Sequence, residues 1–195
     1  MTYTNWRKRL MNKEKSKRLE GKMYYNKDSF LLQEHLSVQK KLYCYNRVRP
    51  DKLKKRTRIL KKILGSFGSD ICMEQPFLCD FGYNIFIGDH FYSNYNLIIL
   101  DCNKVTIGNN CFIGPNVSIF TVNHSLDRKE RIHDLEYAKP ITIGDDVWIG
   151  GGAIINPGIT IGDNVVIGSG SVVTTNIPSN SLAVGNPARV IRTLS

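Results

Sequence analysis

Four histidines are the side chains of this chain best suited to move a proton near neutral pH: His35, His90, His124 and His133. An unperturbed imidazole titrates at about pH 6.5, so it can accept a proton from a hydroxyl and return it later in the same reaction. His124 stands apart because it ends a regular repeat and precedes a long polar segment. A fixed backbone on one side and an open face on the other favour His124 as a general base. His35 lies in a helical pattern and His90 in a turn, and we expect both at the surface.

A catalytic imidazole presents one ring nitrogen to its substrate while a partner holds the other. Glu136 lies at the far end of the same polar segment and is our candidate for that partner. Asp127 and Asp134 are rival carboxylates in the segment, and the sequence does not choose among the three.

The element that precedes and follows His124 is a six-residue repeat, in which an aliphatic residue is usually followed by glycine. A period of six fits neither an α-helix nor a two-residue strand alternation. It predicts a triangular coil of about 18 residues per turn, with isoleucines pointing inward, glycines at the corners and successive coils stacked in parallel. The repeat comprises Ile107-Gly108, Ile113-Gly114, Ile143-Gly144, Ile149-Gly150, Ile161-Gly162 and Ile167-Gly168, with Ile119, Ile155 and Val173 in phase.

The repeat breaks twice, and such breaks in a solenoid are candidate functional sites. The stretch between Phe120 and Thr142 is polar, lacks the hexad, and predicts a protruding loop over 121–141 without secondary structure. Ile87 and Ile107 are twenty residues apart instead of eighteen, which predicts a bent corner in the segment FYSNYNLIILDC. We expect the two irregular segments to be neighbours in space.

Charge divides the 195-residue chain into two parts. Residues 1–75 carry twenty Lys and Arg against seven Asp and Glu, whereas residues 76–195 carry seven against ten. We therefore expect a basic, mainly helical segment over 1–70 and a β-helix over 71–195. Leu53, Leu60, Ile63 and Leu64 predict one apolar helix face that ends at Gly65. A solvated helix explains the basic charge, with attraction to an acidic partner as the alternative, and no motif favours nucleic acid.

The apolar runs, the N-terminal segment and the cysteines indicate the compartment of the protein and the redox state of its thiols. No apolar run approaches the length of a membrane span, and MTYTNWRKRLMNKEK does not resemble a signal peptide. The five cysteines, an odd number without CxxC spacing, are expected to be reduced thiols. These features predict a cytoplasmic protein.

Several segments together resemble one known family. PFLCDFGYNIFIGDHFYSNYN, VNHSLD, DDVWIGG, AVGNPARVIR and the N-terminal RLEGKMYYNKDSF are similar to the maltose and galactoside O-acetyltransferases. The similarity covers about residues 18–192. It implies a left-handed parallel β-helix of hexapeptide repeats that assembles as a homotrimer and transfers acetyl from acetyl-CoA to a hydroxyl without a metal. His124 matches the family's catalytic histidine, and Glu136 matches a position that relatives fill with glutamate or methionine.

The resemblance also assigns binding residues. On the acceptor side it implies Asp80, Tyr92, Asn94 and Asp101, with Asn94 and His124 in one cleft. Two departures concern the acceptor: Asn26 stands where galactoside enzymes carry a substrate-binding aspartate, and Cys102 replaces a second aspartate. On the donor side it implies a slot for coenzyme A built largely from backbone groups. The donor-side positions are Trp148 and Gly151, with Ser169, Thr174 and Thr175 along the slot, and Arg189 and Arg192 on the phosphates.

Three other classes compete with this interpretation. An antibiotic O-acetyltransferase shares the fold, although RLEGKMYYN favours the sugar branch. A zinc lyase would need histidines at close ligand spacing, which His90, His124 and His133 do not have. A structural β-helix without activity would not need the NHSLD loop, Trp148 and the terminal arginines together.

Overall fold

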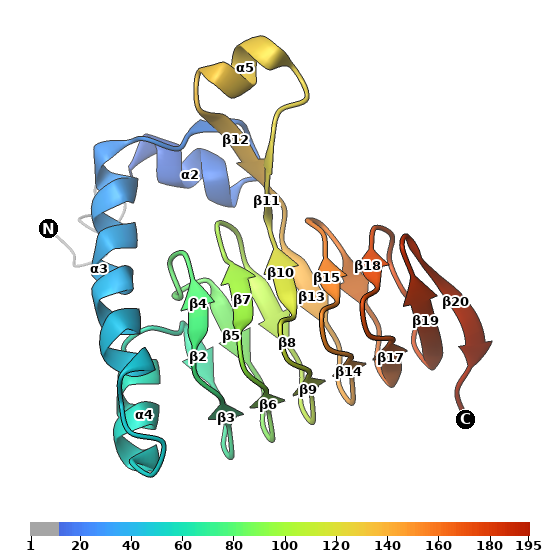
Figure 1. Ribbon diagram of the computed structural model, residues 1–195. Helices are drawn as coiled ribbons and strands as arrows, with labels where there is room; N and C mark the ends of the chain where they lie inside the picture. The colour runs from blue at the N-terminus through green and yellow to red at the C-terminus, as the bar shows by residue number, and fades with distance from the viewer. Residues whose placement is uncertain (1–11) are drawn as a thin grey trace, which may run out of the picture.

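The structure, a computed structural model, describes residues 12–195. The sequence-based expectation about a targeting segment concerns Met1 onward and lies mostly outside these residues. Helices cluster at one end of a long solenoid of short parallel strands, and the C-terminus lies at the other end (Figure 1). The helices are α2 (Lys13–Leu19), α3 (Ser29–Asn46), α4 (Leu53–Leu60) and, within the protruding segment, α5 (Arg128–Ile132).

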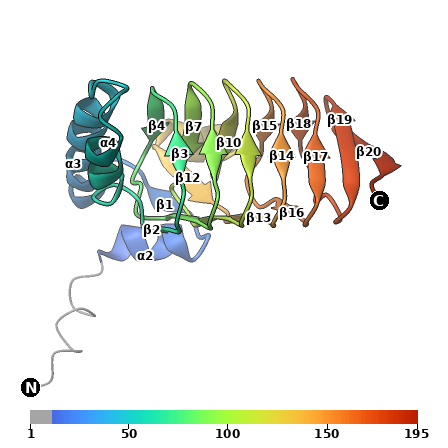
Figure 2. The same cartoon turned by 90° about the horizontal axis from the view of Figure 1, so that it is seen from below.

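The solenoid has three walls, and Figure 2 shows its stacked coils from below. Wall A contains β2 (Ser66–Phe67), β5 (Ile85–Ile87), β8 (Val105–Ile107), β13 (Ile141–Ile143) and β16 (Thr160–Ile161). Wall B contains β3 (Cys72–Met73), β6 (Tyr92–Ser93), β9 (Phe112–Ile113), β14 (Trp148–Ile149), β17 (Val165–Ile167), β19 (Ser181–Gly185) and β20 (Ala188–Thr193). Wall C contains β4 (Phe77–Cys79), β7 (Leu97–Leu100), β10 (Ser118–Phe120), β15 (Ile154–Ile155) and β18 (Val172–Val173).

The hexad isoleucines fill the core, as the repeat predicts. Ile113, Ile119, Ile149 and Ile155 are at most 1 % exposed, and the residues above and below them in the same wall are aliphatic except for Ser93, which lies next to Ile113. Stacking each inward residue on the next coil removes apolar surface from water along the whole axis, which stabilises the solenoid.

The glycines after these isoleucines have a different role from the one expected. None of them has a positive φ, and the corner residues that do are mostly Asn and Asp, such as Asn110 and Asn164. Instead, a Cβ on Gly114 would lie 2.5 Å from the backbone nitrogen of Gly151 in the next coil. Glycine is needed there because neighbouring coils approach closely, not because the chain turns.

The basic segment packs directly on the solenoid. Val38, Leu42 and Tyr45 of α3 belong to the same buried cluster as the first coils, and wall A already begins at Ser66. The predicted helix is present as α4, but it ends at Leu60 and not at Gly65. Leu60 and, beyond the helix, Ile63 and Leu64 are buried, whereas Leu53 is 60 % exposed. Within residues 12–195, none of the helices is long and apolar enough to cross a bilayer.

Corner length varies only where wall C passes to wall A, which we call the CA corner. Equivalent residues on either side of it are eight apart in the first two coils (Leu78 to Phe86, Ile98 to Thr106) and six apart in a later coil (Ile154 to Thr160). In the third coil the spacing from Ser118 to Thr142 is twenty-four, because the protruding segment leaves there. The irregular coils therefore stack on one another at one edge.

The protruding segment is not the structureless loop that the sequence predicts. It forms an antiparallel hairpin of β11 (Val122–His124) and β12 (Leu135–Ala138), with the short helix α5 at its tip. The strand β1 (Tyr24–Tyr25) adds to the outer side of β12, so the N-terminal segment completes a three-stranded sheet above the solenoid (Figure 1).

Candidate active site

The three-stranded sheet aligns one residue from each strand. His124 on β11 pairs with Glu136 on β12, and Glu136 pairs with Tyr24 on β1. Side chains of directly paired residues in an antiparallel sheet lie on the same face, so the imidazole, the carboxylate and the phenol form a row. The register of the sheet brings together residues that are 112 positions apart in the sequence.

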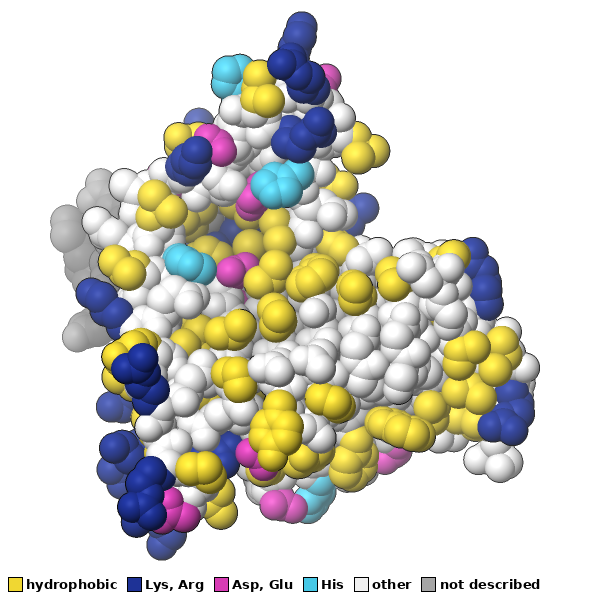
Figure 3. All heavy atoms as spheres, in the orientation of Figure 1, with side chains coloured by type: hydrophobic (Ala, Val, Ile, Leu, Met, Phe, Trp, Pro, Cys, Tyr) yellow, Lys and Arg dark blue, Asp and Glu magenta, His cyan; other side chains and the backbone are white. Residues whose placement is uncertain are grey.

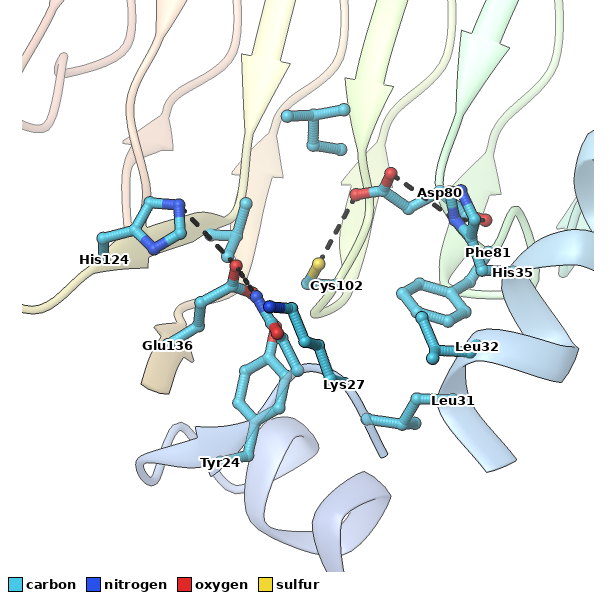
Figure 4. A pocket seen from close by; sticks show the side chains of 13 residues that line it. Tyr24, Lys27, Leu31, Leu32, His35, Asp80, Phe81, Cys102, His124 and Glu136 are labelled. Carbon is cyan, nitrogen blue, oxygen red and sulfur yellow. Dashed lines mark hydrogen bonds and ion pairs between the residues drawn. The ribbon is translucent and has the colours of Figure 1, made fainter. Parts of the chain in front are cut away.

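Glu136 is the centre of that row (Figure 4). Its Oε2 accepts a hydrogen bond of 2.8 Å from the Tyr24 hydroxyl, and its Oε1 accepts one of 2.5 Å from Nδ2 of Asn26. Oε1 also lies 3.7 Å from Nε2 of His124. The glutamate side chain is only 13 % exposed, whereas the histidine side chain is 59 % exposed. The carboxylate is thus held firmly, and the imidazole beside it is open to a ligand.

The rival loop carboxylates have other partners. Asp127 accepts from the backbone nitrogens of Lys129 and Glu130 and caps α5. Asp134 lies 2.7 Å from the Lys27 ammonium. Of the three candidate partners for His124, Glu136 is therefore the carboxylate that faces it.

The row borders a pocket of about 460 Å³ between the hairpin, α3 and the first coils. Figure 3 shows it as a hollow beneath the protruding segment, with hydrophobic side chains on its floor and histidines at its rim. Phe81, Leu100 and Val122 line it, and His124 lies at one side. Across the pocket are Asp80 and His35 of α3, whose side chain is 41 % exposed, as expected for a surface position, but borders the pocket (Figure 4).

Asp80 carries a carboxylate with few donors. Among residues 12–195, its donor is the Cys102 thiol at 3.4 Å, and Nδ1 of the His35 imidazole lies 3.8 Å from its Oδ1. His35 Nδ1 also lies 3.1 Å from the Asp80 carbonyl oxygen. Burial raises the pKa of Asp80 and raises that of the Cys102 thiol well above its ordinary value. The carboxylate has unused acceptor capacity that faces the pocket, which suits a ligand rich in hydroxyl donors.

Asp101 does not face this pocket, which corrects its assignment to the acceptor side. It is fully buried, and its carboxylate accepts hydrogen bonds from the backbone nitrogens of Asp80, Phe81 and Asn84. Burial raises the pKa of Asp101 to about 7. Its role in the structure is to hold the enlarged corner that carries Asp80.

Four other predicted residues lie on wall B or at the edge where wall B passes to wall C, which we call the BC corner. A second pocket of about 570 Å³ there is lined by Tyr92, Asn94, Trp148 and Gly151, among others. It shares no lining residue with the pocket of His124. Within one chain, Asn94 and His124 are thus not in one cleft, because the strands of wall C separate the BC corner from the CA corner.

A row of outward side chains leads from this second pocket toward the C-terminus. Trp148 pairs with Val166, Val166 with Leu182, and Leu182 with Arg192. At about 4.8 Å per strand the row from Trp148 to Arg192 is about 14 Å long. Arg189, opposite Val184 on the same hairpin, is exposed.

The three other donor-side residues divide between the two corners. Ser169 stacks at the BC corner, where Gly170 donates a backbone hydrogen bond of 2.9 Å to Gly151. Thr174 and Thr175 follow β18 and lie at the CA corner, further along the axis from His124. All three side chains are exposed. The backbone N–H of Gly151 donates to no group among residues 12–195, so it is available to a ligand in the second pocket.

Two histidines lie away from both pockets. His90 is exposed at a corner and lies 3.1 Å from Asp70, and His133 caps the exposed helix α5. Among residues 12–195, no three His, Cys, Asp or Glu side chains are grouped so as to hold a metal ion, and the five cysteines are free thiols.

Comparison with known proteins gives a consistent set of similarities. Residues 17–68 match the maltose acetyltransferase hexapeptide capping motif, residues 140–175 the bacterial transferase hexapeptide (six repeats), and residues 104–122 the hexapeptide repeat of succinyl-transferase. The galactoside O-acetyltransferase of Escherichia coli K12 is 40 % identical over 186 residues, which are 95 % of this chain and 92 % of that protein.

Two solved structures have nearly the same fold. The crystal structure of a maltose O-acetyltransferase from Clostridium difficile 630 has a TM-score of 0.92 and 50 % identity, covering 93 % of this chain and 97 % of that one. A galactoside acetyltransferase in complex with coenzyme A has a TM-score of 0.91 and 39 % identity, covering 94 % and 92 %.

Proposed function

Since this chain belongs to the hexapeptide-repeat acetyltransferases of the maltose and galactoside O-acetyltransferase type, we propose that it transfers acetyl from acetyl-CoA to a hydroxyl of a sugar or glycoside. The observation that carries this proposal is the pairing of an exposed imidazole with a buried carboxylate at the rim of a pocket of about 460 Å³. A relative solved with coenzyme A supports the choice of donor.

His124 acts as the general base. Its Nε2 faces Glu136, so Nδ1 is the nitrogen left for the acceptor hydroxyl. As the hydroxyl oxygen attacks the thioester carbonyl, Nδ1 takes the hydroxyl proton, and Glu136 stabilises the imidazolium that forms. When the C–S bond breaks, the imidazolium returns the proton to the thiolate, which leaves an acetyl ester and free coenzyme A. The 3.7 Å separation of His124 and Glu136 would shorten as the imidazole becomes charged.

The acceptor occupies the pocket beside His124. Asp80 and Cys102 lie across that pocket, and the hydroxyls of a sugar would supply the donors that the Asp80 carboxylate lacks. His35 adds a second polar group on the same side. Asn26, which the resemblance assigned to the acceptor, also lines this pocket, and its amide nitrogen donates to Glu136.

The donor lies along wall B. The apolar row from Trp148 through Leu182 suits the pantetheine arm, and the exposed guanidinium of Arg192 at its end suits a phosphate, with Arg189 beside it. The unused N–H of Gly151 would stabilise the negative charge that develops on the thioester oxygen.

The two pockets become one site if neighbouring chains meet. A single chain carries the base and acceptor pocket at the CA corner and the donor row on wall B, and no lining residue is shared. A homotrimer of triangular solenoids would set the CA corner of each chain against wall B of the next, making three equivalent sites. Thr174 and Thr175, at the CA corner, would then reach the donor bound to a neighbour.

Arg189→Ala and Arg192→Ala are each expected to raise the KM for acetyl-CoA about tenfold or more, because a charged hydrogen bond contributes about 1.5–3 kcal/mol. The KM of the acceptor should stay nearly unchanged. Comparing acetyl-CoA with its 3′-dephospho analogue checks the phosphate assignment. If both donors respond alike to each substitution, these arginines do not bind that phosphate.

The proposed reaction is tested by following free thiol released from acetyl-CoA with mono- and disaccharides, glycosides and hydroxylated antibiotics as acceptors. Acceptor-dependent release with a sugar or glycoside is the expected result. Release confined to antibiotics would identify a xenobiotic-acetylating enzyme of the same fold. Absence of acceptor-dependent release together with absence of coenzyme A binding would reject the activity and favour a structural role.

A further inference from the structure

We propose that Tyr24 and Asn26 are positioning residues for acetyl transfer: they clamp the Glu136 carboxylate so that it faces the His124 imidazole. This inference rests on the proposed function, and it assigns to the N-terminal segment a direct part in the reaction. Neither residue needs to contact the substrate for this role.

The clamp is visible in the hydrogen bonds of Glu136. Tyr24 donates to Oε2 at 2.8 Å and Asn26 donates to Oε1 at 2.5 Å, so each carboxylate oxygen has one donor from the N-terminal segment. Two donors on different oxygens fix the rotation of the carboxylate about its terminal bond. Oε1 is left 3.7 Å from Nε2 of His124, which it can approach without turning.

The donors are themselves held in place. Tyr24 is 2 % exposed and packs with Leu31, Phe81 and Ala138 in a small second core beneath the pocket. The backbone N–H of Asn26 donates a hydrogen bond of 3.1 Å to the Asp134 carbonyl. The ammonium of the next residue, Lys27, lies 2.7 Å from the Asp134 carboxylate. The segment from Tyr24 to Lys27 is thereby tied to the hairpin that carries both Glu136 and His124.

Both donors also serve a carboxylate that has little contact with water. The hydroxyl of Tyr24 and the amide N–H of Asn26 give it hydrogen-bond partners in a site where its side chain is only 13 % exposed. Burial and the neighbouring Glu136 both raise the pKa of Tyr24, so its phenol remains a donor at neutral pH. Without the clamp, Glu136 could rotate away from His124, and the imidazolium formed during attack would lose a fixed counter-charge.

The test is a double-mutant cycle on kcat. Tyr24→Phe keeps the ring in its core and removes one donor, and kcat is expected to fall about tenfold while KM for acetyl-CoA and for the acceptor change less than about twofold. In a Glu136→Gln background the same substitution should change kcat by less than about twofold, because the carboxylate it positions is gone. Asn26→Ala should show the same pattern in kcat and provides a second variant if Tyr24→Phe is unstable.

Tyr25→Phe is the matched control, since Tyr25 is the adjacent strand residue, is 43 % exposed and pairs with Leu135 instead of Glu136. It should leave kcat unchanged. NMR of the His124 ring nitrogens gives a readout without turnover: the signals should move in Tyr24→Phe and Asn26→Ala but not in Tyr25→Phe.

Three results would overturn the clamp. These are a wild-type kcat in both variants, an equal loss in the Glu136→Gln background, or unchanged His124 ring signals. The NMR arm decides the matter even if no acceptor supports thiol release, in which case the proposed function fails separately.

Discussion

His124→Ala is expected to lower kcat by about 10²–10⁴-fold, the range for loss of a general base, which corresponds to roughly 3–5 kcal/mol of barrier. The variant should fold and assemble normally, because the side chain is 59 % exposed on the hairpin and takes no part in the isoleucine core. It should still bind acetyl-CoA, since the proposed donor row lies on wall B. Glu136→Gln should cost less, because it weakens stabilisation of the imidazolium but leaves the base. Thiol release under saturating donor and acceptor measures both effects.

Three other histidines serve as comparisons. His90→Ala and His133→Ala should leave kcat near the wild-type value, because both residues lie away from the pockets. His35 lines the acceptor pocket, so His35→Ala should act mainly through the KM of the acceptor. If His124→Ala retains more than about a tenth of the wild-type kcat while His35→Ala lowers kcat by about a hundredfold or more, His35 is the base.

Two inactive variants should restore activity when they assemble in the same oligomer. His124→Ala damages the CA-corner half of the site, and the double variant Arg189→Ala/Arg192→Ala damages the wall-B half. If each site takes one half from each of two chains, random mixing of equal amounts makes about one site in four from two intact halves. A trimer that carries both tags contains both variants, and one of its three sites is then built from two intact halves. With acetyl-CoA well below its KM, doubly tagged hybrids should therefore recover about a third of wild-type activity, whereas each parent has about a hundredth or less.

The controls for this experiment follow from the geometry. Hybrids of His124→Ala with His124→Gln damage the same half in every chain and should recover nothing. Light scattering should give about three times the chain mass of 22.2 kDa. An active monomer, or doubly tagged hybrids that stay as inactive as their parents, would show that one chain holds the whole site.

The solenoid and its core could be predicted from the sequence because the inward residues repeat every six positions and contact only the next coil. The same locality explains what was missed. The strands β11 and β12 carry no hexad. On its outer side β12 pairs with β1, and the paired residues Tyr24 and Glu136 are 112 positions apart in the sequence. No local pattern encodes a pairing at that distance, so the segment was predicted as a loop without secondary structure.

The site was partly predictable for related reasons. His124 and Glu136 could be proposed because both lie in the break of the repeat. The helical pattern predicts an exposed His35, and its side chain is 41 % exposed, but the pattern does not show that this side of α3 borders the pocket. The resemblance assigns Asp101 to the acceptor side, but Asp101 is buried and accepts hydrogen bonds from backbone N–H groups of the enlarged corner. Whether a polar residue at such a corner faces the pocket or the interior depends on how the corners stack, which the sequence alone does not show.

The variable length of the CA corner has an evolutionary consequence. Equivalent residues of walls C and A are six, eight or twenty-four positions apart across this corner, and the parallel register on either side is the same in each case. Insertions at this edge can therefore be selected for a new acceptor while the donor row, on a different face, is left unchanged. Substrate range and cosubstrate use can diverge independently on such a scaffold, so new specificities can arise by lengthening one edge of it.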